Sequence, residues 1–241
     1  MSIFKRESMP SIAKEIAKIN AKEAEEKDIN LRELSTEMKT SSFKDIKALE
    51  MFFKLVGNLH DKLATYDTII SDDSSGRLVS LVLRKVIEEA KKRKRIEGGV
   101  HTYFVAAGRH GHRITNQMSD FLQSKKPEIQ KALVVTEYIE TGQSIGRIVD
   151  VLRSLDIKFD IATLSISNKL SRYSSKITRR LYYGEPNSSD GLKFYNRKNM
   201  TGITKSDTSP HPVKSREPDF EEINNARQDI NRLAAELKKL I

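Results

Sequence analysis

A short stretch of the chain combines two carboxylates with two hydroxyls around a glycine. Glu137 and Glu140 are followed by Thr141, Gly142 and Ser144, and a helical pattern begins immediately afterwards. Thr136 alone separates Glu137 from a preceding four-residue apolar run. The apolar run is typical of a buried parallel strand. A turn between such a strand and a helix presents backbone N–H groups that bind phosphate well. Carboxylates on the same turn could bind ribose hydroxyls or a metal ion, or accept a proton.

This stretch resembles the loop that binds 5-phosphoribosyl pyrophosphate (PRPP) in type I phosphoribosyltransferases. In that family, four apolar residues precede two acidic residues, two apolar residues, a third acidic residue and Thr-Gly-x-Thr/Ser. The resemblance places Glu137 and Glu140 at the second and third acidic positions. It places the phosphate-binding positions at the turn itself, on Thr141, Gly142, Gln143 and Ser144.

Two residues depart from the family pattern. Thr136 stands where the first acidic residue is expected, and Tyr138 fills a position that is usually small and aliphatic. The acidic pair is therefore reduced to one carboxylate. A strand, turn and helix with Thr-Gly is also common in other α/β proteins, where it serves only as a capped helix start.

A second candidate loop precedes this one in the chain. A short strand is expected over residues 67–71, and it is followed by small and charged residues at a helix start, namely Ser74, Ser75, Gly76 and Arg77. The glycine allows close approach of a ligand, and the guanidinium is a forked donor for phosphate. The resemblance implies that pyrophosphate binds here; the alternative is a simple helix N-terminus.

A third candidate loop follows the next expected strand, over residues 100–107. A polar loop is expected over 108–119, and it contains Arg109, His110, His112 and Arg113. The resemblance, here to the orotate type, implies a mobile loop that closes over the pyrophosphate, with arginines neutralising its charge and a histidine supplying a hydrogen bond or a proton. An exposed loop with incidental histidines is the alternative.

The elements around these loops predict the fold class. Strand patterns at 67–71, 100–107, 132–135 and 159–165 alternate with helical patterns, of which the clearest cover 42–66, 77–93 and 145–155. This alternation indicates an α/β fold with an open, mainly parallel sheet and helices on both faces, as in phosphoribosyltransferases. In such sheets ligands bind beyond the carboxyl ends of the strands.

The remaining segments are expected to be extensions. We divide the chain into an N-terminal helical extension over 1–41, with a charged helix at 11–27, an α/β domain over 42–185, and a loop-rich segment with a closing amphipathic helix over 186–241. The N-terminus lacks an apolar signal segment and no run is long enough to span a membrane, so a cytoplasmic protein is expected. The absence of cysteine excludes disulfides and thiolate chemistry.

Charge bears on the partners. The net charge is +10, and residues 168–217 hold eleven Lys and Arg against four Asp and Glu. This surplus suits phosphorylated small molecules or a nucleic-acid backbone. The resemblance implies transfer of a 5-phosphoribosyl group from PRPP, with Mg²⁺, to a nitrogenous base, by a protein expected to be a homo-oligomer. The alternative is a non-catalytic regulator on the same fold that senses PRPP or nucleotides or associates with nucleic acid.

Overall fold

The structure is a computed structural model that describes residues 30–105, 111–168, 180–186, 188, 202–204, 211, 213–215 and 218–241; of residues 73–75, 111–114 and 204 it describes the backbone alone. Five parallel strands form one sheet in the order β2-β1-β3-β4-β5. Their bounds are β1 Thr68–Asp72, β2 His101–Val105, β3 Lys131–Ile139, β4 Lys158–Ile166 and β5 Leu181–Glu185. The expected α/β fold with a parallel sheet is thereby confirmed.

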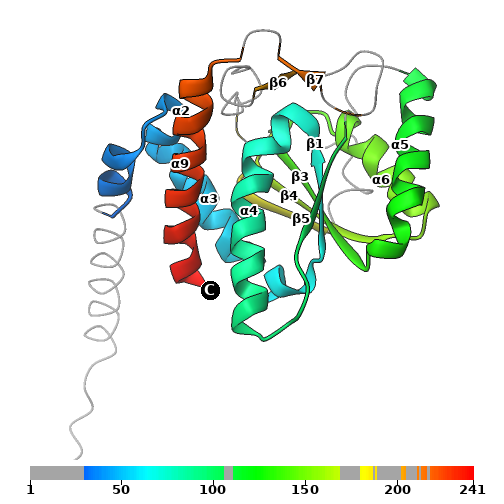
Figure 1. Ribbon diagram of the computed structural model, residues 1–241, viewed down its shortest axis with the longest axis horizontal. Coiled ribbons are helices and arrows are strands. Elements are labelled where there is room, and N and C mark those ends of the chain that lie inside the picture. The colour runs from blue at the N-terminus through cyan, green and yellow to red at the C-terminus, as the bar shows by residue number, and fades with distance from the viewer. Residues whose placement is uncertain are drawn as a thin grey trace, which may run out of the picture.

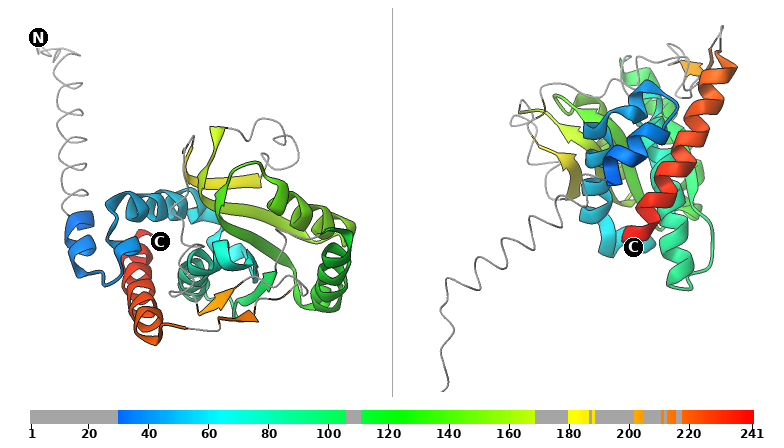
Figure 2. Two further views of the ribbon diagram at one scale, coloured as in Figure 1. Left: turned by 90° about the horizontal axis from the view of Figure 1, so that it is seen from above. Right: turned by 90° about the vertical axis from the view of Figure 1, so that its left-hand side faces the viewer.

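Helices cover both faces of the sheet (Figures 1 and 2). One face carries the helical residues 30–37 and the elements α2, α3, η1, α4 and α9, and the other carries α5 and α6. The bounds are α2 Ser41–Lys44, α3 Ile46–Leu59, η1 His60–Thr65, α4 Asp73–Arg93, α5 Gly111–Lys125, η2 Lys126–Glu128, α6 Gln143–Ser154, α9 Phe220–Leu237 and η6 Lys238–Leu240. A small antiparallel ribbon pairs β6 Ile203–Thr204 with β7 Val213–Lys214.

The two apolar cores follow from alternation along the strands. Side chains such as Leu133 and Val135 pack under α3 and α4, whereas Ala132 and Val134 pack under α5 and α6. Because both faces are covered, the strand reads in the sequence as a continuous apolar run instead of an alternating one.

Three sequence expectations need correction. The strand expected at 132–135 continues to Ile139, because β4 is equally long and pairs with it as far as Ile166. The loop expected over 108–119 is wrong from Gly111 onward, where α5 begins, because Met118 and Leu122 give this polar segment a buried stripe. The single helix expected over 42–66 is interrupted at Asp45, whose backbone is extended and whose side chain accepts a hydrogen bond from the N–H of Lys47.

The C-terminal helix α9 holds the first described residues of the chain against the core. The carboxylate of Asp229, in the middle of α9, is fully buried and accepts hydrogen bonds at 2.8 Å from the N–H of Lys39 and from the N–H and hydroxyl of Thr40. Arg232, one turn later, forms an ion pair with Glu37 at 3.2 Å. A buried carboxylate with three donors holds the start of α2 against α9.

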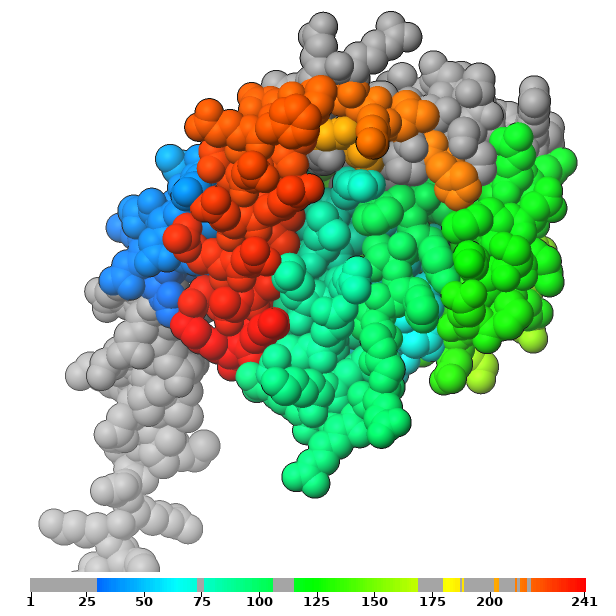
Figure 3. All heavy atoms as spheres, in the orientation of Figure 1, coloured from blue at the N-terminus to red at the C-terminus, as the bar shows by residue number. Residues whose placement is uncertain are grey.

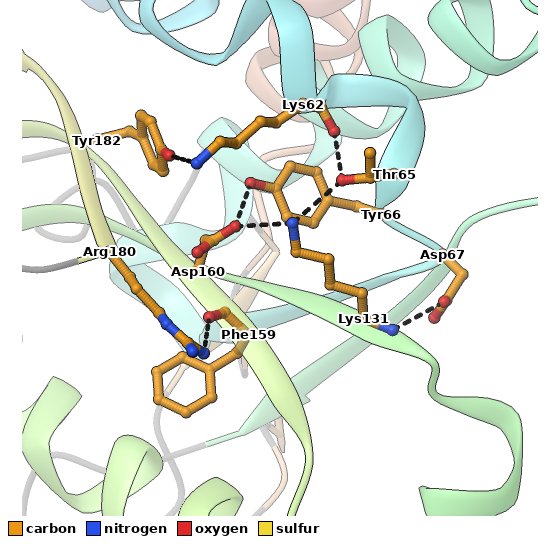
Figure 4. A network of polar contacts seen from close by, with 9 residues as sticks. All are labelled: Lys62, Thr65, Tyr66, Asp67, Lys131, Phe159, Asp160, Arg180 and Tyr182. Atoms are coloured by element: carbon orange, nitrogen blue, oxygen red, sulfur yellow. Dashed lines mark hydrogen bonds and ion pairs between the residues drawn. The ribbon is translucent and has the colours of Figure 1, made fainter.

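A polar network fixes the strands at their amino ends (Figure 4). Asp160 at the start of β4 is 5% exposed; it accepts a hydrogen bond from the hydroxyl of Tyr66 at 2.8 Å and pairs with the ammonium of Lys131 at 2.9 Å. Burial and this hydrogen bond raise the pKa of Tyr66 well above its ordinary value. Asp67 accepts a hydrogen bond from the N–H of Lys131 at 2.9 Å. These contacts link the starts of β1, β3 and β4 and so fix their register.

Two segments that the sequence singled out lie wholly or mostly outside the described residues. The charged helix expected at 11–27 and most of the basic segment 168–217 lie outside the described residues. In the part of the chain that the structure describes, no helix is both long and apolar enough to cross a membrane.

Candidate functional site

The site lies at the carboxyl edge of the sheet, where the direction of winding reverses. The chain passes from β1 to β2 on one side and then returns to place β3 on the other side of β1. In open α/β sheets this reversal opens a crevice between the two strands in which ligands bind. The helices that follow β1 and β3, namely α4 and α6, lie on opposite faces of the sheet and both begin at this edge.

The turn after β3 has the geometry of an anion-binding helix start. Gly142 is buried, precedes the first residue of α6, and adopts the left-handed conformation with φ of 82° and ψ of 2°. A glycine tolerates this conformation and has no side chain to cap the helix. The carbonyl of Gly142 accepts the first helical hydrogen bond, from the N–H of Gly146 at 2.7 Å. The earlier N–H groups of α6 have no carbonyl acceptor within the helix, and an anion at this helix start would also benefit from the helix dipole.

The polar side chains of this turn differ in exposure. Glu140 and Thr141 are exposed, as is Gln143 in the first turn of α6, and Ser144 is half-buried. The hydroxyl of Thr141 lies 3.5 Å from the N–H of Gln143, at the limit of a hydrogen bond. The turn thus offers a solvent-accessible hydroxyl and carboxylate beside a row of backbone donors.

Glu137 is placed differently from the expectation. It lies within β3, not on the turn, and it is completely buried, as is its neighbour Thr136 at 1% exposed. The hydroxyl of Thr163 on β4 lies 3.0 Å from the carbonyl oxygens of both Glu137 and Ser165. Glu137 is therefore buried within the strand that leads to the turn, and the exposed carboxylate of the pair is Glu140.

The loop after β1 is a helix start that is packed tightly against β3. A Cβ atom on Gly76 would lie 2.4 Å from the carbonyl oxygen of Val135 and 2.7 Å from the hydroxyl oxygen of Ser71. Gly76 therefore has a packing role that is sufficient to explain it. Arg77, the next residue, is half-buried and holds its guanidinium carbon 4.2 Å from the ring centroid of Phe104 on β2. The backbones of Ser74 and Ser75 belong to the first turn of α4, and their side chains lie outside the described structure.

The third loop is only partly described. Arg109 and His110 lie outside the described residues, and the backbones of His112 and Arg113 form part of the first turn of α5. The starts of α4 and α6 thus lie at one edge, and the side chains of the third loop lie outside the described structure. Among the described residues, no group of three or more His, Cys, Asp or Glu could hold a metal ion by itself.

Two residues of the site were missed in the sequence. Phe104, which stacks on Arg77, was assigned only to a strand, and Thr163, which supports the end of β3, carried no signal beyond a strand pattern. Phe104 lies next to the last residue of β2, and this position was the available signal for it, because the carboxyl ends of strands form the ligand edge of an open sheet. Thr163 is buried within β4 and gave no such signal.

Comparison with known proteins adds little to this geometry. No family model matches the sequence, and no curated protein matches it. One solved structure that matches the chain is the crystal structure of orotate phosphoribosyltransferase from Aeropyrum pernix, with a TM-score of 0.35 and 17% identity over 61% of this chain and 72% of that chain. The fold and the edge described above define a doubly wound, parallel α/β protein, and the chemistry of its site rests on the site itself.

Proposed function

We propose that this protein binds PRPP at the carboxyl edge between β1 and β3 and transfers its 5-phosphoribosyl group to a nitrogenous base. The observation that carries the proposal is the left-handed Gly142 before α6, in a turn that resembles the PRPP loop and lies at the reversal of the sheet. The first-turn N–H groups, with Thr141 and Ser144, would bind the 5-phosphate. The start of α4, with Arg77, would bind the pyrophosphate.

The proposed reaction is a substitution at the anomeric carbon. The nitrogen of the acceptor base forms a bond to that carbon while the bond to the pyrophosphate oxygen breaks, and pyrophosphate leaves with the electron pair. The proton lost by the nitrogen would pass to Glu140, because this carboxylate is exposed on the turn. The remaining contribution of the protein is to position the reactants and to stabilise charge.

The residues of this site fit a Mg²⁺ ion that would be held mainly by oxygens of the substrate. Mg²⁺ is commonly bound through one or two carboxylates together with substrate phosphates and water. Glu140 supplies one exposed carboxylate at the turn, and the oxygens of PRPP would supply the rest. When bound, the ion would neutralise the charge that develops on the pyrophosphate.

The binding step is tested by calorimetric titration with PRPP and Mg²⁺. We expect the wild type to bind and the double variant Thr141→Val, Ser144→Ala to bind about tenfold or more weakly, since hydrogen bonds to a charged phosphate are lost. Ser154→Ala is the matched control, because its hydroxyl, at the opposite end of α6, donates to the carbonyl of Val151 at 2.8 Å. Absence of binding to the wild type at millimolar PRPP would refute the proposal.

A second function is favoured by one observation: Glu137 and Thr136 are both buried, which leaves Glu140 as the exposed carboxylate of this motif. A site of this kind could bind PRPP or nucleotides without turnover, as in a regulator, and the basic segment 168–217 would then contact nucleic acid. Pyrophosphate release with a panel of bases separates the two functions. In a transferase, Glu140→Gln should lower turnover about a hundredfold or more while PRPP still binds. In a regulator the wild type binds PRPP and releases no pyrophosphate.

A further inference from the structure

A groove lies between the N-terminal halves of α4 and α9. It encloses about 450 Å³, which is within the range of small-molecule sites. These two helices lie side by side in Figures 1 and 3, where α9 is red and α4 is blue-green. The groove lies between two helices on one face of the sheet and not between β1 and β3. Arg77, near the start of α4, is the residue that it shares with the proposed pyrophosphate site.

The floor of the groove is apolar. It is formed by Leu78 and Leu81 of α4 and by Ala226 and Ile230 of α9, of which Leu81 alone is more than a few per cent exposed. Phe220, the first residue of α9, is 72% exposed and lies one turn before the groove residue Ile223. Such a surface favours a flat apolar body over a fully hydrated ion.

The rim of the groove is cationic. Arg77 and Lys85 lie on the α4 side, Arg227 and Asn231 lie on the α9 side, and none of the lining residues is acidic. Within the described chain, neither Lys85 nor Arg227 forms an ion pair with a carboxylate; Arg227 donates a hydrogen bond to the side chain of Asn224 at 3.4 Å. These cations therefore retain the capacity to neutralise an anionic ligand.

We propose that this groove is a second ligand site, which takes a nucleoside monophosphate. The base would lie on the apolar floor, where the planar guanidinium of Arg227 can stack on it and the amide of Asn231 can pair with its polar edge. The phosphate would lie beside Lys85. A second copy of this chain is disfavoured as the occupant, because each copy carries a net charge of +10.

The test is calorimetric titration of the full chain with AMP, GMP, CMP and UMP, with the four nucleosides and inorganic phosphate as fragments. We expect at least one nucleotide to bind the wild type more tightly than its nucleoside or phosphate alone. The double variant Lys85→Gln, Arg227→Gln should weaken that binding about tenfold or more. The control Lys92→Gln, Lys94→Gln removes the same charge from the exposed end of α4 and should leave binding nearly unchanged.

The same titrations distinguish this site from the proposed PRPP site. Thr141→Val, Ser144→Ala should weaken PRPP and leave the nucleotide unaffected, and the groove variant should do the reverse. Failure of all four nucleotides to bind the wild type would overturn the groove proposal without touching the PRPP proposal. Equal weakening by the groove and control variants would also overturn it, as would loss of nucleotide binding only in the turn variant. Urea unfolding of each variant shows whether the fold is retained.

Discussion

Replacing Gly76 by alanine should separate α4 from β3 at the candidate site. The added Cβ would lie 2.4 Å from the carbonyl oxygen of Val135, whereas ordinary contacts begin near 3.4 Å, so the first turn of α4 must move by about 1 Å. The obstructing atom belongs to the backbone of a central strand and cannot rotate away. Overpacking of this kind costs about 1–3 kcal/mol.

Gly146→Ala is a closely matched control for this substitution. Gly146 occupies the fourth position of α6, as Gly76 does in α4, and a Cβ there meets nothing within 4 Å. Both variants gain about 1 kcal/mol of helix propensity, so the difference between them isolates the steric cost. Subtraction predicts that Gly76→Ala is less stable than Gly146→Ala by about 1–3 kcal/mol.

The assay is urea unfolding followed by circular dichroism. With a slope of about 2 kcal/mol per molar urea, the two midpoints should differ by about 0.5–1.5 M. PRPP binding should also weaken in Gly76→Ala, because the start of α4 is displaced. Coincident unfolding midpoints for the two variants would refute the packing role assigned to Gly76.

Three further predictions concern two buried polar groups and a second tightly packed glycine. Asp229→Ala should lower the free energy of unfolding by about 3 kcal/mol, because three donors, of which the two on Thr40 are buried, lose their acceptor. It should also expose the segment before α2 to protease, whereas Asp229→Asn, which keeps one oxygen acceptor, should lose less stability. Gly184→Ala should be destabilising by about 1–3 kcal/mol, since its Cβ would lie 2.2 Å from the carbonyl oxygen of Met51. Gly57→Ala, on the exposed surface of α3, should be stabilising, because a Cβ there meets nothing within 4 Å. Urea midpoints that fall in the opposite order would contradict this. Because the pKa of Tyr66 is higher in the folded than in the unfolded chain, its hydroxyl stabilises the fold fully below the ordinary tyrosine pKa of about 10. This contribution is lost as the pH rises toward the folded-state pKa. The fall in melting temperature at alkaline pH should therefore be smaller in Tyr66→Phe than in the wild type.

The sequence by itself determined the fold class and the turn at Gly142. Apolar runs such as Ala132–Val135 predict buried strands because a parallel sheet is covered on both faces, and the glycine at 142 predicts a turn that only a residue without a side chain adopts easily. These signals are local, so each can be read from neighbouring residues. The closing amphipathic helix, expected at the end of the segment 186–241 and found as α9 and η6, can also be predicted from local pattern.

Only the tertiary structure decided how these parts meet. The burial of Glu137 depends on the length of β4, which lies more than twenty residues further along the chain, and the packing role of Gly76 depends on a carbonyl of β3. The acceptor role of Asp229 toward Thr40 joins residues 189 positions apart. No local pattern encodes such contacts, because pairing, burial and the closing of a groove are set by which elements become neighbours when the whole chain packs.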